Sequence, residues 1–196
     1  MSNAFSAAAG SNSFVPLRLS GQSVLVKAIA VALGSLFLAA SSWIEVPMYP
    51  VPMTMQTFAV TLIGALYGWR MGAITVLTWL AEAAVGFPVL AGGAGGLAHF
   101  AGPTGGYLVA FPLAAAMVGW LAERGWTSKG NLLRNVAAML IGGAFILAFG
   151  GLWLAGMIGV SDAWTYGVGP FIVGGILKAV LATASVEATR RIHSAL

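Results

Sequence analysis

Long apolar runs, separated by short polar or glycine-rich segments, dominate the 196 residues of the chain. A helix that spans a bilayer needs about 17 to 25 mostly apolar residues, and these runs lack the alternation of a membrane β-strand. The pattern predicts an all-α membrane protein with six transmembrane helices, of which the second and third are short. The predicted spans are residues 24–43, 55–69, 71–86, 106–122, 136–157 and 170–189.

The composition supports this fold class and argues against several others. Hydrophobic residues make up 59% of the chain and charged residues 7%, whereas a soluble domain carries about 25% charged residues. The net charge of +4 is scattered through apolar sequence, which argues against a nucleic-acid-binding face. Because the chain has no cysteine, disulfides and cysteine-ligated metals are excluded.

The basic residues predict the orientation in the membrane. If the amino terminus lies in the cytoplasm, all Lys and Arg residues except Lys178 fall on the inner side, as membrane proteins prefer. The first apolar run begins near residue 24 and is too long for a signal peptide. We expect a flexible cytoplasmic tail (1–23), a six-helix transmembrane domain (24–190) and a cytoplasmic C-terminal tail (191–196).

The three loops expected on the outer side are rich in Gly, Pro and aromatic residues. They cover residues 44–54, 87–105 and 158–169. Long ordered loops are usually functional, so three of them on one face predict a lid over an outward-facing pocket. Prolines at positions 47, 50 and 52 would stiffen the first loop and reduce the entropy lost on closure. The alternative is that the loops only connect helix ends.

Lys178 is the one basic residue predicted within the bilayer. It lies eight residues after Pro170, about 12 Å into the membrane at 1.5 Å per residue. A charge at that depth costs at least about 2.5 kcal/mol unless it faces a polar cavity or a partner. Helical side chains lean toward the preceding turn, so Lys178 is expected over Gly174 and Gly175, which leave space for a ligand. The alternative is an ion pair with Glu82.

The sequence shows no catalytic or cofactor-binding constellation. His99 and His193 are 94 residues apart and lack metal-ligand spacing. The chain has no GxxxxGK[ST] phosphate-binding loop, and GAGGLA at 93–98 lacks the strand that precedes a dinucleotide site. Glu82 and Lys178 alone do not specify an intramembrane enzyme. We expect neither an enzyme nor a bound cofactor or metal.

Three segments together resemble one family. They are VPMTMQTFAV at 51–60, GFPVLAGGAGGLAHFAGPTGGYL at 86–108 and PFIVGGILKAVLA at 170–182. Across about residues 24–190 the chain resembles the BioY proteins, the biotin-binding S components of energy-coupling factor (ECF) transporters. The resemblance implies a six-helix domain in the bacterial inner membrane that captures biotin from outside. It also implies a membrane T component and two cytoplasmic ABC-type ATPases as partners, with ATP used by those partners.

Several residues fit the chemistry of biotin, which joins a neutral ureido ring to a carboxylate tail. Thr54 and Gln56 offer a hydroxyl and an amide, and Tyr107 offers a ring wall and a hydroxyl. Gly93 is one of several loop glycines that allow the backbone to approach a ligand closely. The other glycines of this kind are at positions 92, 95, 96, 105 and 106.

The last predicted span departs from the family pattern at one position. In the family an Asp usually stands three residues before the Lys, and the two together contact biotin, whereas this chain has Gly175 there. Lys178 remains as the expected cation of the site. Glu82, Asp162 or loop carbonyls would then have to supply the hydrogen-bond acceptor.

Small residues mark the cytoplasmic half of the first predicted span. Ala28 and Ala32 have the small-xxx-small spacing that lets helices approach closely, and in S components such a pattern packs on the T component. Packing inside the domain is the alternative reading of these alanines. A self-sufficient secondary transporter of biotin or a related vitamin is the alternative function, although neither coupling-ion ligands nor inverted repeats are visible.

Overall fold

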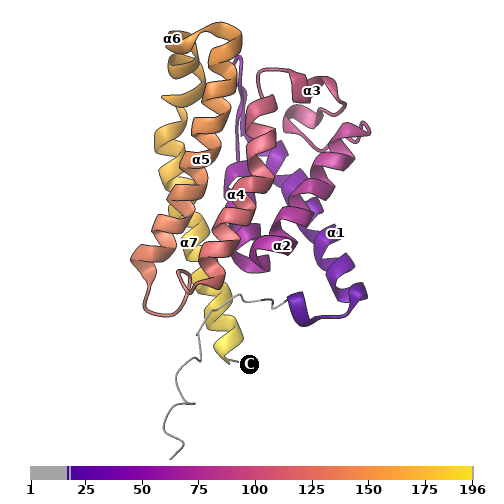
Figure 1. Cartoon of the computed structure of the whole chain (residues 1–196), viewed down its shortest axis with the longest axis vertical. Coiled ribbons are helices and arrows are strands. Elements are labelled where there is room, and N and C mark those ends of the chain that lie inside the picture. The colour runs from indigo at the N-terminus through magenta and orange to yellow at the C-terminus, as the bar shows by residue number, and fades with distance from the viewer. Residues whose placement is uncertain (1–16, 18, 196) are drawn as a thin grey trace, which may run out of the picture.

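The computed structural model describes residue 17 and residues 19–195, so most of the predicted amino-terminal tail lies outside the described residues. A single 3-10 turn, η1 (Leu19–Gly21), precedes α1 (Val24–Trp43). Ser23 caps α1, because its hydroxyl accepts a hydrogen bond from the Val26 amide. The start of α1 and the end of α7 lie at the same end of the molecule (Figure 1). The bounds of α1 agree with the first predicted span.

Four further long helices complete the bundle: α2 (Gln56–Ala84), α4 (Gly105–Glu123), α5 (Leu132–Ile158) and α7 (Phe171–Ala195). Each lies in a stretch that is long and apolar enough to cross a membrane. Within α2, Gly68 has φ +80° and ψ 174° and interrupts the helix. This left-handed φ favours glycine. The kink divides α2 into the two short spans that the sequence predicts, so the six-helix prediction is confirmed.

Small residues let α2 and α4 pack with their backbones in contact. A Cβ added to Gly64 would lie 2.4 Å from the Ala115 carbonyl oxygen, and one added to Gly119 would lie 2.5 Å from the Gly68 carbonyl carbon. Larger side chains at either glycine would push the two helices apart. Close approach of this kind is common between helices in membranes, and here it positions the kink against α4.

All three predicted outer loops contain ordered structure. The first holds an antiparallel hairpin, β1 (Glu45–Val46) and β2 (Met53–Thr54), in which Glu45 pairs with Thr54. The second holds η2 (Ala91–Gly93) and α3 (Ala98–Ala101). The third holds α6 (Val160–Ala163) and a π-helical turn, η3 (Trp164–Val168).

Tryptophan side chains anchor the second outer loop to the helices. The indole N–H groups of Trp43, Trp79 and Trp153 donate to the carbonyls of Pro88, Val89 and Gly102, at 3.0 to 3.1 Å. These tryptophans lie on α1, α2 and α5. The loop is therefore held from three sides over the end of the bundle.

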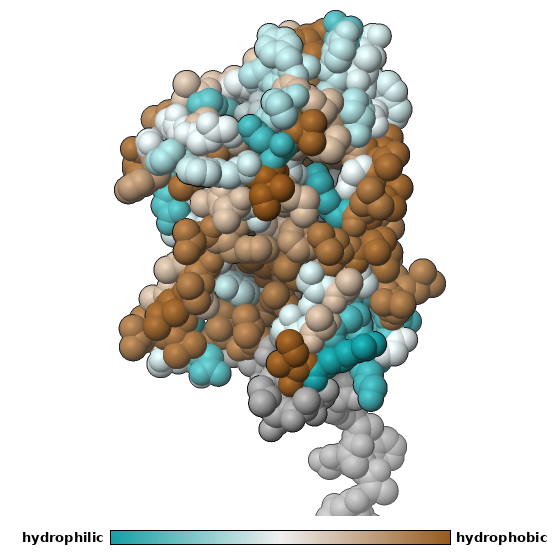
Figure 2. Space-filling view, turned by 180° about the vertical axis from the view of Figure 1, so that it is seen from behind, coloured by the Kyte–Doolittle hydropathy of each residue, from teal (hydrophilic) through white to brown (hydrophobic). Residues whose placement is uncertain are grey.

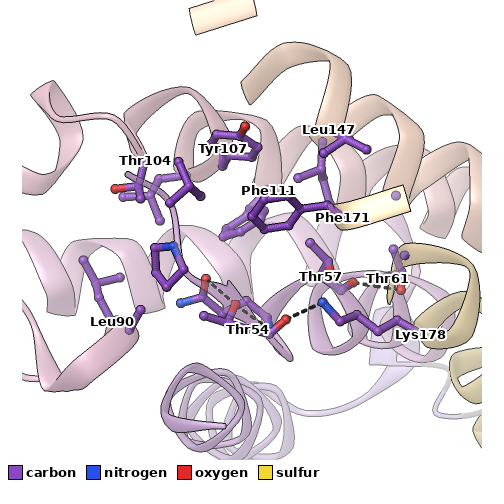
Figure 3. Close-up of a pocket in the computed structure, with 18 of the residues that line it drawn as sticks. Thr54, Thr57, Thr61, Leu90, Thr104, Tyr107, Phe111, Leu147, Phe171 and Lys178 are labelled. Atoms are coloured by element: carbon purple, nitrogen blue, oxygen red, sulfur yellow. Dashed lines mark hydrogen bonds between the residues drawn. The ribbon is translucent and has the colours of Figure 1, made fainter. Parts of the chain in front are cut away.

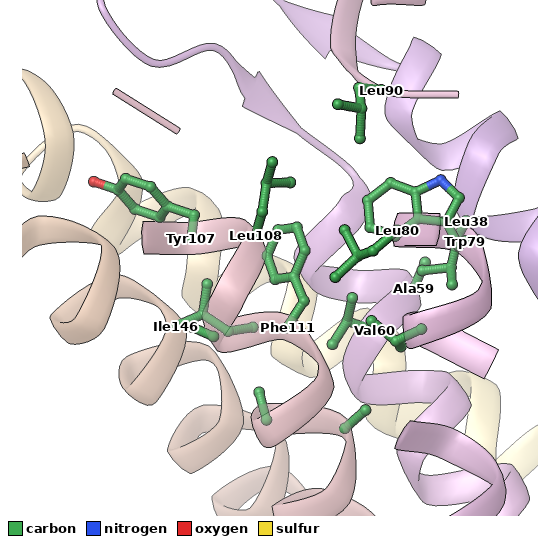
Figure 4. Close-up of a cluster of buried hydrophobic side chains, with 14 of the residues drawn as sticks. Leu38, Ala59, Val60, Trp79, Leu80, Leu90, Tyr107, Leu108, Phe111 and Ile146 are labelled. Atoms are coloured by element: carbon green, nitrogen blue, oxygen red, sulfur yellow. The ribbon is translucent and has the colours of Figure 1, made fainter. Parts of the chain in front are cut away.

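The core and the surface have the distribution expected in a bilayer. Figure 4 shows the buried cluster, in which the rings of Trp79 and Phe111 lie 6.0 Å apart. Apolar residues also cover much of the outside (Figure 2), including Leu133 at 83% exposure. In the most apolar stretch of α4, 67% of the residues are buried, whereas in that of α1 only 22% are. This difference places α4 at the centre of the bundle and α1 at its edge.

Candidate ligand-binding site

A cavity of about 300 Å³ lies among α2, α4, α5 and α7, beneath the outer loops. This volume is at the lower end of the range for small-ligand pockets. Each helix contributes side chains at helical spacing, so one face of each helix points inward. The helix positions that line the cavity are 56, 57 and 61 of α2; 107, 108 and 111 of α4; 139, 143, 146 and 147 of α5; and 171, 175, 178 and 179 of α7.

Thr54 and Gln56 close one side of the cavity and are themselves buried, with 8% and 7% exposure. The Thr54 hydroxyl donates to Gln56 Oε1 at 3.0 Å, and Gln56 Nε2 donates to the Ser42 hydroxyl at 2.8 Å. Gln56 thus joins the hairpin to α1. An amide nitrogen has two protons, so Gln56 can hold this contact and still offer one N–H to a ligand.

Lys178 reaches the same side of the cavity from α7 (Figure 3). Its ammonium donates to the Thr54 carbonyl oxygen at 2.6 Å, which leaves two of its three protons for other acceptors. The alternative ion pair with Glu82 is wrong, because Glu82 instead accepts a hydrogen bond from the Ser35 hydroxyl of α1. A backbone carbonyl of the first loop is therefore the acceptor beside the half-buried Lys178 ammonium.

The two glycines that precede Lys178 have different surroundings. Gly175 lines the cavity, and no atom of the described residues outside its immediate neighbours lies within 4 Å of a Cβ built there. A Cβ on Gly174 would instead meet the Met53 sulfur at 3.1 Å. The space predicted beside Lys178 therefore exists at Gly175, while Gly174 lets the hairpin pack against α7.

Aromatic rings form the opposite wall. Tyr107, Phe111 and Phe171 line the cavity, and Figure 3 shows them on the side away from Thr54. The Tyr107 hydroxyl donates to the Gly167 carbonyl at 2.7 Å, so its proton is already used. A Cβ on Gly150 would lie 2.2 Å from the Tyr107 ring. The ring is thus fixed from both sides and presents a flat apolar face to the cavity.

The described residues that line the cavity include basic side chains but no acidic ones. Lys178 and His99 line the cavity, and no Asp or Glu is found among the described residues that do so. A ligand with a carboxylate, or with neutral oxygen atoms that accept hydrogen bonds, would suit such a site. A cationic ligand would lack a counter-charge. The apolar wall and the few convergent donors are typical of a site for a small, partly apolar molecule.

Three residues predicted to bind substrate lie outside the lining. Gly93 belongs to η2, whose neighbours Ala91 and Ala94 do line the cavity. Glu82 is turned toward Ser35, and Asp162 is exposed in α6. The predictions that brought Lys178, Thr54, Gln56 and Tyr107 together in one site agree with the cavity lining, and direct contacts with a ligand stay predictions for all seven residues.

The sequence reasoning missed other lining residues. Thr57 and Thr61 follow Gln56 on the inner face of α2, and Phe171 starts the α7 face that continues at 175, 178 and 179. The i, i+4, i+7 spacing from Phe171 to Lys178 was a readable signal. His99 was considered only as a metal ligand, although it lines the cavity.

The alanines predicted to dock a partner lie on the outside of the bundle. Ala28 and Ala32 are exposed on α1, whereas Gly34 is buried against Thr75 and Tyr67. The inward small residue of this helix is therefore Gly34. The alternative of internal packing is wrong for Ala28 and Ala32, and their docking role stays a prediction.

Comparison with known proteins gives concordant results. The BioY family model matches residues 12–195. A probable biotin transporter BioY of Pyrococcus horikoshii is 41% identical over 83% of this chain and 96% of its own length. A biotin transporter BioY of Rhizobium etli is 42% identical over 81% of this chain and 85% of its own.

A solved structure agrees with the sequence matches. The crystal structure of the S-component for biotin from an ECF-type ABC transporter superposes with a TM-score of 0.74 and 28% identity, covering 85% of this chain and 92% of that one. The fold, the family model and these relatives agree over most of the chain, and the chain belongs to the BioY family.

Proposed function

We propose that this chain is the substrate-binding membrane component of a biotin uptake system and that biotin binds in the cavity beneath the outer loops. The relatives are named as biotin transporters, not enzymes, and the similar solved structure is an S-component for biotin. The observation that carries the proposal is the cavity itself, which combines an apolar aromatic wall with Lys178 in a chain whose fold matches that S-component.

The donors at the inner end of the cavity fit a neutral ureido ring. Lys178 has two free N–H groups and Gln56 has one. Each of these N–H groups is of the type that can donate to a ureido carbonyl. The ring wall of Tyr107, Phe111 and Phe171 supplies the apolar contact that a fused bicyclic ligand needs. Biotin is the transported substrate in this proposal, and the chain itself needs no cofactor or metal.

The proposed topology places both termini in the cytoplasm. The loop between α4 and α5, which carries Arg124 and Lys129, lies at the end opposite α6 (Figure 1). Such residues favour the cytoplasmic side. The cavity would then open to the outside of a bacterial inner membrane.

Import would depend on partner subunits. We propose that a membrane T component and two cytoplasmic ABC-type ATPases supply the energy, and that the T component docks on the exposed alanines of α1. Exposure of Ala28 and Ala32 supports this surface, since close helix contact needs small residues that are not already packed.

Two measurements test the proposal. Calorimetric titration of the purified chain with biotin should give saturable binding, and desthiobiotin, which keeps the ureido ring, serves as a related ligand. Absence of binding would refute the substrate assignment. In proteoliposomes, biotin uptake should require the T component, the ATPases and ATP; uptake by this chain alone would instead support a self-sufficient secondary transporter.

A further inference from the structure

The cavity has a second ionisable group that the proposed function does not yet use. His99 lies on α3, the short helix of the second outer loop, and its side chain lines the cavity together with Pro103 and Thr104. Lys178 lies on α7, seven residues after Phe171. At 1.5 Å per residue this is about 10 Å from the outer end of that helix. The Lys178 backbone therefore lies below the start of α7, while its ammonium reaches up to the Thr54 carbonyl of the hairpin. His99 belongs to the second outer loop, at the mouth of the cavity.

The backbone around His99 is held, while its imidazole is free to bind. The His99 amide donates to the Gly96 carbonyl at 3.3 Å, and its carbonyl accepts from the Thr104 hydroxyl at 3.4 Å. The side chain is half-buried. None of the described residues forms a hydrogen bond with its ring nitrogens. A fixed backbone with an unpartnered ring at the rim of a cavity presents a donor to whatever occupies that cavity.

The surroundings of the rim favour an anion there. Lys178 and Tyr107 are the other titratable groups of the lining, and neither is acidic. The nearest acid of the first loop, Glu45, lies against Gly92, because a Cβ on that glycine would be 3.5 Å from Glu45 Oε1; Glu45 does not line the cavity. Asp162 is exposed on α6. A carboxylate beside His99 would therefore meet no Asp or Glu among the described residues that line the cavity.

The surroundings of Lys178 and His99 decide which of them takes the carboxylate. A carboxylate placed beside Lys178, whose ammonium lies between α7 and the hairpin, would lose much of its hydration, and this cost can exceed the gain from pairing. At the rim a carboxylate keeps part of its hydration. A neutral ureido group loses far less on transfer to the inner end.

We propose that His99, in its protonated form, recognises the carboxylate of the ligand at the outer rim, while Lys178 donates to the uncharged end below it. This assignment rests on the proposed function, deepens it, and predicts that acid pH strengthens binding. Histidine is the side chain that ordinarily changes charge between pH 5 and 8, whereas an aliphatic carboxylate stays ionised over most of that range.

The test compares biotin with biotinamide, whose tail carries no charge, in calorimetric titrations at pH 5.5 and pH 8.0. The wild-type chain should bind biotin about tenfold or more tightly at the lower pH, the size of a charged hydrogen bond, and should bind biotinamide equally at both. His99→Gln should abolish the pH effect for biotin and leave biotinamide unchanged. His193→Gln, three residues before the last residue of the sequence, is the matched control and should retain the pH effect.

Two further variants separate the possible failures. His99→Lys keeps a positive charge, so it should bind biotin with little dependence on pH, which also shows that the loop folds with a changed side chain. Lys178→Met should weaken biotin and biotinamide by similar factors. If Lys178→Met weakens only biotin, the ligand lies the other way round and the inference is overturned.

A pH effect that persists in His99→Gln would also overturn the inference, because it would belong to another group. These results leave the proposed function standing, since biotin still binds. Failure of the wild-type chain to bind biotin at either pH would overturn the proposed function itself.

Discussion

Replacing Lys178 by Met tests the polar end of the cavity. The substitution keeps an unbranched side chain of similar length and removes the ammonium. In the structure this ammonium donates to the Thr54 carbonyl at 2.6 Å and has two protons left for a ligand. The variant should therefore lose both the contact with the hairpin and the donors for the ureido carbonyl.

The expected loss follows from these contacts. A hydrogen bond to a charged donor contributes about 1.5 to 3 kcal/mol, which corresponds to a roughly 10- to 150-fold weaker affinity for biotin. Global stability should fall much less, because methionine packs well in apolar surroundings and the half-buried cation disappears together with its desolvation cost.

Calorimetry measures the loss of biotin affinity, and hydrogen exchange measures the loosening of the hairpin. Affinity should fall in Lys178→Met, and the Met55 amide, which donates to the Ile44 carbonyl at the base of the hairpin, should exchange faster in the empty protein. Lys129→Met, an exposed lysine of the inner loop, is the matched control and should change neither quantity. Unchanged affinity in Lys178→Met would refute the reasoning and leave the lysine as a structural tether for Thr54.

Three other predictions concern different parts of the molecule. Ala32→Trp should abolish ATP-driven uptake in the complete system while biotin binding persists, because bulk on the exposed face of α1 blocks close helix contact; loss of both would contradict the docking role. Pro47→Gly, exposed and outside the cavity lining, should weaken binding about two- to fivefold if the hairpin orders on closure, and unchanged affinity would leave the loop a connector. Asn135 is fully buried, and neither polar atom of its side chain has a partner among the described residues. Asn135→Leu should therefore raise the thermal midpoint by removing a cost of about 1 to 3 kcal/mol, and a lowered midpoint would show that Asn135 has a stabilising partner.

The sequence predicted the helices well because membrane spans depend on local composition. The first span agrees with α1 at both ends, and the short second and third spans correspond to α2 on either side of Gly68. The basic residue Arg70 separates the two apolar runs in the sequence, and the structure breaks the helix two residues earlier, at Gly68. The start of α5 and the end of α7 extend beyond the predicted spans, since polar helix turns continue outside the hydrocarbon layer.

The site could be predicted only in part because side-chain partners depend on how helices face each other. The depth of Lys178 and the space at Gly175 follow from spacing within one helix. The contact between Lys178 and Thr54 joins residues 124 positions apart, and the contact between Glu82 and Ser35 joins α2 to α1. No pattern within one segment determines such pairs, so Glu82 was assigned to the wrong neighbour.

The most direct test of the central claim, that biotin occupies this cavity, is calorimetric titration of chains in which the cavity is filled. Gly143 and Gly175 line the cavity, and a Cβ on either meets no described atom within 4 Å beyond its immediate neighbours. Leucine at either position is a better helix former and projects into the space that the ligand would need. Gly156 of α5 is equally open but exposed and outside the lining. Our account predicts that Gly143→Leu and Gly175→Leu lose biotin binding while their thermal midpoints stay at or above that of the wild type, and that Gly156→Leu binds like the wild type. Normal binding by both cavity variants would contradict it.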